Sequence, residues 1–148
     1  MTEIRFYHLQ RTSEDRAIPQ IAHKAYQSGK RVIIKGTSDE QVEKLNGVLW
    51  TFSADIFLPH GSAEDKFEAQ QPVYLTAGND NPNGAKIIIT TPGCTVENPG
   101  AFDLCCEMLD GKNDAQIAGA RTRWKDYKDK GFDVSYWQET EKGWEKKA

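Results

Sequence analysis

The chain has 148 residues, of which 38% are hydrophobic and 28% are charged, and its 19 basic and 22 acidic residues give a net charge of −3. This length and composition predict an ordered globular domain with a sizeable core, and they exclude a disordered chain. The negative balance argues against a protein that coats nucleic acid, because neutralising many phosphates requires a basic surface. A local basic patch is still compatible with it.

The N-terminus and the cysteines indicate a reducing, cytoplasmic setting. The opening MTEIRFYHLQRTSEDR lacks the basic and apolar regions of a secretory signal, and no apolar stretch is long enough to span a membrane. Cys94, Cys105 and Cys106 have neither C-x-x-C spacing nor the spacing of a disulfide framework. We expect these cysteines to be reduced and structural.

The first part of the chain alternates strand and helix patterns. Residues 4–9 and 30–35 are rich in β-branched and aromatic side chains, which predicts strands. Between them, the sequence at 12–15 starts a helix that ends at Gly29, and Pro19 marks either a kink or the true beginning of that helix.

A second helix is capped by Ser38, and its apolar stripe is Val42, Leu45, Val48 and Leu49. The segment from 52 to 71 indicates mainly loop. Further strands are predicted at 72–75, 85–90, 101–109 and 132–137.

The last helix is predicted over about 114–130, with a cap at Asn113 and a stop at Gly131. The charged residues from about 141 are expected to fray. Together the elements predict one α/β domain over residues 1–148, with a mostly parallel central sheet and helices on both faces.

Catalytic chemistry finds little support in the residue pattern. The turn Lys35-Gly36-Thr37-Ser38 follows a strand and precedes a helix, but it matches neither glycine-rich phosphate motif. No histidine, cysteine or carboxylate set has metal-site spacing, and no nucleophile motif occurs. We therefore predict no catalytic residue, cofactor or metal. A small nucleotide- or phosphate-binding enzyme that uses Gly36 is the alternative.

The last predicted helix carries two adjacent stripes. The apolar stripe is Ile117, Ala120, Trp124 and Tyr127, and the basic stripe is Arg121, Lys125 and Lys128. Residues 121–130 hold five basic and two acidic residues in an acidic chain. Cations beside aromatic rings suit an acidic peptide. A solvated helix with a buried apolar stripe explains the same spacing, and single-stranded nucleic acid is a further candidate ligand.

The ordered motifs resemble the chi subunit family of bacterial DNA polymerase III. The matching segments are IRFYHL, SGKRVII, LW followed by F-x-P-H, and ARTRWKDYKDKGFDVSYWQ with a later Gly-Trp. The resemblance implies a nucleotide-binding-like fold without a functional nucleotide site. It also implies a non-catalytic clamp-loader accessory subunit that binds the acidic C-terminal tail of single-stranded DNA-binding protein and bridges to the psi subunit.

The resemblance also implies two sets of site residues. The tail-binding positions of the family fall on Ile117, Arg121, Trp124, Lys125 and Lys128. Ile117 replaces a family cation, so that end of the site is expected to be less basic unless Lys112 substitutes for it. The psi-docking positions fall on Trp50, Phe57, Leu58, Pro59 and His60. An apolar loop of this kind is either a satellite core or a docking surface.

Overall fold

The computed structural model describes residues 2–10, 14–51, 59–62, 68–141 and 143–148. The strands are β1 (Glu3–Leu9), β2 (Val32–Lys35), β3 (His60–Ser62), β4 (Val73–Thr76), β5 (Ile87–Thr90), β6 (Leu104–Asp110), β7 (Asp133–Thr140) and β8 (Gly143–Lys146). The helices are α1 (Glu14–Gln27), α2 (Asp39–Thr51) and α3 (Asp114–Asp129), with short 3-10 helices at Glu68–Gln70 and Pro99–Ala101.

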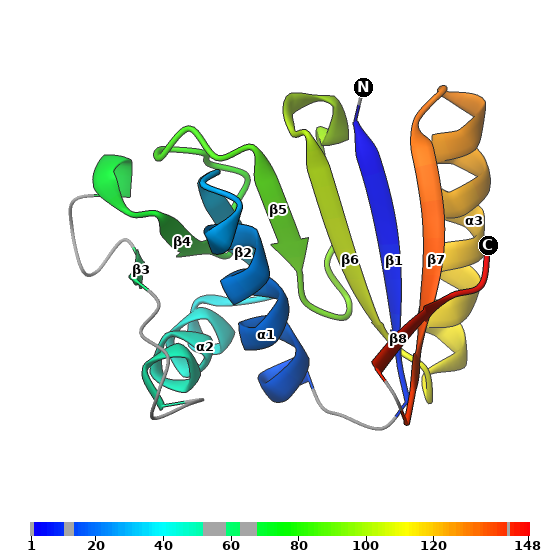
Figure 1. Cartoon of the computed structure of the whole chain (residues 1–148), viewed down its shortest axis with the longest axis horizontal. Helices are drawn as coiled ribbons and strands as arrows, with labels where there is room; N and C mark the ends of the chain where they lie inside the picture. Colours follow the sequence, from blue (N-terminus) through cyan, green and yellow to red (C-terminus); the bar gives the residue numbers. More distant parts are fainter. Residues whose placement is uncertain (1, 11–13, 52–58, 63–67, 142) are drawn as a thin grey trace.

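The described strands form one open sheet in the order β3-β4-β2-β5-β6-β1-β7-β8 (Figure 1). Neighbours run parallel except for the antiparallel pair β7 and β8. Helices α1 and α2 share one hydrophobic core with the sheet, and α3 shares a second core with the opposite face. The predicted α/β class, with a mostly parallel sheet between helices, is confirmed.

Local sequence signals account for the helix ends. The Ser38 hydroxyl accepts a hydrogen bond from the Gln41 backbone N–H at 3.2 Å, and the Asn113 side chain accepts one from the Gln116 N–H at 3.1 Å. Both are N-caps, as predicted. Gly131, directly after the C-cap of α3, has a φ of +86°, a conformation that glycine adopts without strain.

One of the two alternatives for Pro19, that the first helix begins there, was wrong. Helix α1 begins before Pro19 and continues through it, so the proline does not mark the helix start. The buried Pro19 ring lies within the helix although its nitrogen has no hydrogen to donate. Residues 12 and 13, the expected start signal, lie outside the described residues.

Strand β3 lies in the segment from 52 to 71, which was expected to be mainly loop because of its proline, glycine and acidic residues. It pairs with β4, and α2 holds it from one side. The Ser62 hydroxyl donates to Glu43 at 3.0 Å, and a hydrogen bond of 3.0 Å joins His60 Nε2 to the Asn46 carbonyl oxygen. Tertiary contacts therefore override the local preference.

The residues from about 141, which were expected to fray, include a strand. Strand β8 pairs with β7, and the Trp144 ring packs edge-on against Tyr7, with 5.0 Å between ring centroids. Trp144 joins the core that also holds α1. The partly buried Trp144 ring helps to hold this short charged segment, because burial of part of an indole removes apolar area from water.

The carboxyl ends of β1 and β6 are where a nucleotide would lie in a fold of this kind, because the chain leaves these neighbouring strands toward opposite faces. Two hydrogen bonds tie the chain together at this edge of the sheet. The Gly111 N–H donates to the Leu9 carbonyl at 2.8 Å, and the Gln116 side chain accepts from the Asp110 N–H at 2.8 Å. The turn between β6 and α3 is thus held against the end of β1.

Gly111 provides a test of this close approach. A methyl group at Gly111 would overlap the His8 imidazole and the Leu9 carbonyl oxygen. We expect Gly111→Ala to lower the free energy of unfolding by about 1–3 kcal/mol, the usual cost of overpacking. Gly47→Ala is the matched control, because nothing lies within 4 Å of its added carbon and alanine favours helix. Urea denaturation measures both, and equal stabilities would contradict the close packing.

Candidate functional site

A hollow of about 440 Å³ lies between α3 and β7. Its lining comes from α3, from β1 and β7, and from the end of the described chain. The lining residues are His8, Ile117, Ala120, Arg121, Trp124, Tyr136, Gln138 and Ala148. Three of the five predicted tail-binding residues therefore line one cavity together with residues from other elements.

Aromatic packing sets the position of the helix wall. Phe6 of β1 is fully buried, and its ring centroid is 6.2 Å from that of Trp124 and 6.1 Å from that of Tyr127. The Trp124 and Tyr136 rings meet edge to face at 6.3 Å. Ala120, one turn before Trp124, is also buried. The apolar stripe of the helix is thus partly core, and its half-buried Trp124 borders the hollow.

The three cations of the predicted basic stripe differ in where they lie relative to the hollow. Arg121 lines the hollow, whereas Lys125 and Lys128 are exposed outside its lining. Lys128 Nζ lies 4.9 Å from the centre of the Trp124 ring, a cation–π contact. Within the described chain, neither Arg121 nor Lys125 has an ion-pair partner. Their charge is available to a ligand.

Arg123 has a structural role. Its Nε donates to Glu107 Oε1 at 2.9 Å, and the Glu107 side chain is only 1% exposed on β6. Burial raises the pKa of the Glu107 carboxyl, and the charge of Arg123 opposes that rise. The guanidinium also lies 5.9 Å from the Phe6 ring centre. A buried carboxylate needs such a partner, so Arg123 is committed to the fold.

His8 and Tyr136 form the polar floor of the hollow. A hydrogen bond of 2.5 Å joins His8 Nδ1 to the Tyr136 hydroxyl. Burial lowers the pKa of His8 below its ordinary value of 6.5, and the charge of Asp110 opposes this. Burial raises the pKa of Tyr136, and the positive charge of Arg121 acts against that rise. At neutral pH both groups are therefore uncharged, and Arg121 supplies the charge of the lining side chains.

Four lining residues were missed by the sequence analysis: His8, Tyr136, Gln138 and Ala148. Strand alternation could have placed His8 on the same face as Phe6, since every second residue shares a face. No local signal could have found Ala148, because it reaches the hollow through β8. Lys112, the candidate replacement for the cation missing at Ile117, lies in the turn before α3 and does not line the hollow.

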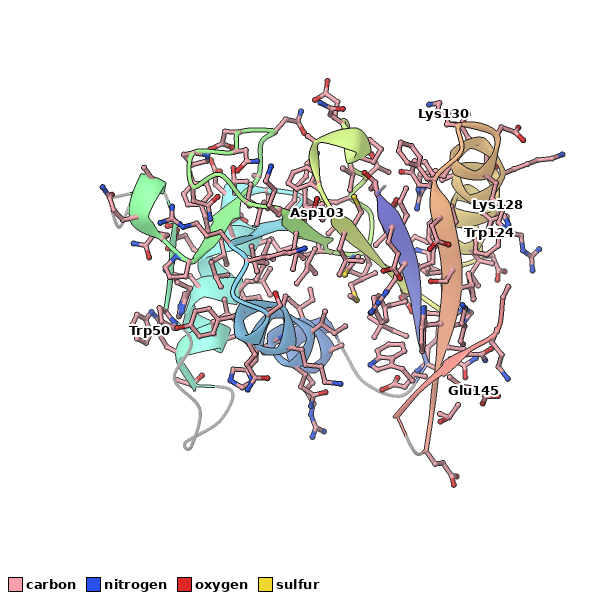
Figure 2. The ribbon with its side chains drawn as sticks, turned by 45° about the horizontal axis from the view of Figure 1, so that its top comes forward. Trp50, Asp103, Trp124, Lys128, Lys130 and Glu145 are labelled. Carbon is pink, nitrogen blue, oxygen red and sulfur yellow. The ribbon has the colours of Figure 1, made fainter. Side chains whose placement is uncertain are left out.

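The second predicted surface lies at the other end of the sheet (Figure 2). Trp50, at the end of α2, is 56% exposed, and its ring centroid is 4.6 Å from that of the buried His60. Pro59 is half-buried, and Phe57 and Leu58 lie outside the described residues. Among the described residues of this region, Trp50 is thus the large apolar group that reaches solvent.

The turn at Gly36 is occupied by the side chain of Gln41. The Gln41 side-chain oxygen accepts hydrogen bonds from the Thr37 N–H at 2.6 Å, the Thr37 hydroxyl at 2.8 Å and the Thr91 hydroxyl at 3.1 Å. These donors are therefore satisfied within the chain. Elsewhere in the described chain, no group of three or more histidine, cysteine or acidic side chains is placed to hold a metal ion.

The cysteines match the prediction of reduced, structural thiols. Cys94, Cys105 and Cys106 are all free and buried. Burial raises the pKa of the Cys106 thiol to about 12, and burial also raises the pKa of Cys105. Thiols with raised pKa values are poor nucleophiles.

Comparison with known proteins connects this geometry to a family. The sequence model of the family described as "DNA polymerase III chi subunit, HolC" matches residues 1–135. The chain belongs to the DNA polymerase III chi subunit family. The predicted resemblance is confirmed, and membership gives the chain an accessory role in DNA replication.

Individual chi proteins are similar over shorter or longer stretches. A probable DNA polymerase III subunit chi of Rickettsia prowazekii is 37% identical over 60% of this chain and 54% of its own length, so the match spans about half of that relative. The chi subunit of Pseudomonas aeruginosa is 29% identical over 76% of this chain and 78% of its own length. That of Escherichia coli is 25% identical over 82% of each.

The family match ends at residue 135, before β8 and most of β7. Part of the hollow is therefore built by residues beyond the matched region, namely Tyr136, Gln138 and Ala148. None of the described helices combines the length and the apolar character needed to cross a membrane.

The two arginines of α3 should separate stability from ligand binding. Arg123→Ala leaves Glu107 buried without its cation, and we expect a loss of about 3 kcal/mol in the free energy of unfolding. Arg121→Ala, the same change two residues earlier, should alter stability by less than about 0.5 kcal/mol because Arg121 is exposed and unpaired. Urea unfolding of both variants makes the comparison. A similar loss in both variants would show that Arg123 is not the structural cation.

Proposed function

We propose that this chain is a non-catalytic adaptor of the replication machinery that binds the acidic C-terminal tail of single-stranded DNA-binding protein in the hollow beside α3. The observation that carries the proposal is the juxtaposition of an unpaired guanidinium, Arg121, with the half-buried Trp124 ring. An acidic peptide that ends in an apolar residue and a carboxylate has the complementary chemistry.

The residues divide the work of binding. Lys125 and Lys128 raise the local positive potential and steer an acidic chain toward α3. Arg121 can clamp a carboxylate through two parallel N–H donors. Ile117, Ala120 and Trp124 offer an apolar wall to the terminal side chain. The volume of about 440 Å³ lies within the range of small ligand pockets and can hold one bulky side chain.

The exposed Trp50 supports a second partner at the far end of the sheet. We propose that a psi subunit, or an equivalent clamp-loader component, docks on Trp50 and the neighbouring Pro59. Figure 2 shows Trp50 and Trp124 at opposite ends of the molecule. Strands β3 and β7 are separated by five strands of one sheet. Two partners at these places would be held apart by a rigid spacer, which suits an adaptor.

Arg121→Ala tests the tail site. Removal of a charge-assisted hydrogen bond should weaken binding of a tail peptide by about 1.5–3 kcal/mol, measured by fluorescence anisotropy with a labelled peptide. Lys86→Ala, which removes the same charge from another exposed position, is the control and should leave affinity almost unchanged. Binding should also weaken as salt rises. Unchanged affinity in a folded Arg121→Ala variant would reject the assignment.

Trp50→Ala tests the second surface. An aromatic anchor at the centre of an interface contributes about 2 kcal/mol or more, so affinity for a purified psi subunit should fall by about 30-fold in calorimetry. The tail peptide should still bind to this variant, and Arg121→Ala should still bind psi. Loss of both activities in either variant would indicate general unfolding, and psi affinity equal to wild type would place the docking surface elsewhere.

A further inference from the structure

The end of the described chain forms a second wall of the hollow beside α3. Strand β8 pairs antiparallel with β7, with Glu145 opposite Gln138 and Lys146 opposite Trp137. Beyond β8 the pairing changes. The Lys147 and Ala148 N–H groups both donate to the Tyr136 carbonyl, at 2.7 and 3.4 Å, and the Tyr136 N–H donates to the Ala148 carbonyl at 3.2 Å. Two residues facing one define a β-bulge, a feature that re-aims side chains.

The strand pairing sorts the side chains of this segment onto two faces. Residues directly opposite each other on paired strands share a face. Lys146 therefore lies with Trp137, on the face that packs against α1, as does Trp144. Glu145 lies with Gln138, on the face of the hollow.

Lys147 lies on the side of the hollow. Its Nζ is 3.3 Å from Glu145 Oε1, and Ala148, the next residue, is part of the lining. Both side chains of the Glu145–Lys147 pair are well exposed, at 58% and 44%. An ion pair this exposed is weak and can exchange partners readily. Lys147 thus lies next to the lining residue Ala148, on a different element from Arg121.

We propose that Lys147 is a binding residue for the acidic ligand and that Glu145 attenuates it. The inference rests on the proposed tail-binding function. Arg121 lies on the α3 side of the hollow, and Lys147 lies beside the wall formed by β8 and the residues after it (the β8 wall). An acidic peptide in the hollow therefore has positive charge near it from two elements. On binding, Lys147 exchanges Glu145 for a ligand carboxylate. The acidic Glu145 lowers the resting potential at this rim, so it lowers the affinity for every acidic peptide.

Adjacent lysines on opposite faces allow a matched experiment on the full chain. Binding of an acidic tail peptide to Lys147→Ala and Lys146→Ala is measured by fluorescence anisotropy at low ionic strength. Both variants lose one exposed charge at the same end of the chain. We expect about a fivefold loss of affinity for Lys147→Ala and less than about a twofold loss for Lys146→Ala. Glu145→Gln should tighten binding by about twofold, because it frees Lys147.

The outcomes separate this inference from the proposed function. If wild type binds the peptide, Arg121→Ala weakens it, and the two lysine variants behave alike, then the role of Lys147 is overturned and the tail site stands. If wild type does not bind the peptide at all, both proposals are overturned. Trp144→Ala, which removes the contact with Tyr7 that anchors β8, gives a second readout. It should reproduce the loss seen for Lys147→Ala, and wild-type affinity in this variant would count against the β8 wall.

Discussion

Packing against Phe6 sets where α3 lies on the sheet. This residue is fully buried in β1, and the rings of Trp124, Tyr127 and Tyr136 have centroids 6.2, 6.1 and 6.3 Å from its own. Strand β1 is hydrogen-bonded to β6 on one side and to β7 on the other. The backbone that carries the Phe6 ring is therefore held in place by both neighbours. Aromatic rings from a helix and a neighbouring strand converge on it. The hollow, which needs α3 and β7 at a defined separation, follows from this packing.

The electrostatics of the last helix follow from how its cations are used. Arg123 neutralises the buried Glu107, Lys130 pairs with Asp126 at 3.1 Å, and Lys128 covers the Trp124 ring. Arg121 keeps an unpaired charge at the rim of the hollow. A net charge of −3 conceals this arrangement, because acidic residues elsewhere outweigh a basic face. The negative net charge argues against a protein that coats nucleic acid, yet it is compatible with a binding site for an acidic protein segment.

The success of prediction from sequence differs between local and long-range features. The caps at Ser38 and Asn113 and the strands of the sheet interior were predictable, because short-range hydrogen bonds and apolar runs determine them. Strand β3 was not, because its three residues have no strand preference and depend on α2 and β4. The candidate site was predicted on its helix side alone, since helical spacing orders Ile117, Arg121 and Trp124 but says nothing of what faces them.

By itself, the sequence determined the α/β class, the amphipathic last helix and the family, because these depend on periodicity and on ordered motifs along the chain. The tertiary structure decided which cations are free. Arg121 and Arg123 are two residues apart and chemically identical, and only the position of Glu107 on β6 distinguishes them. The tertiary structure also determined which residues line the hollow opposite α3. A charged segment expected to fray becomes β8, because the chain brings Trp144 onto Tyr7, a contact between opposite ends of the sequence that no local pattern encodes.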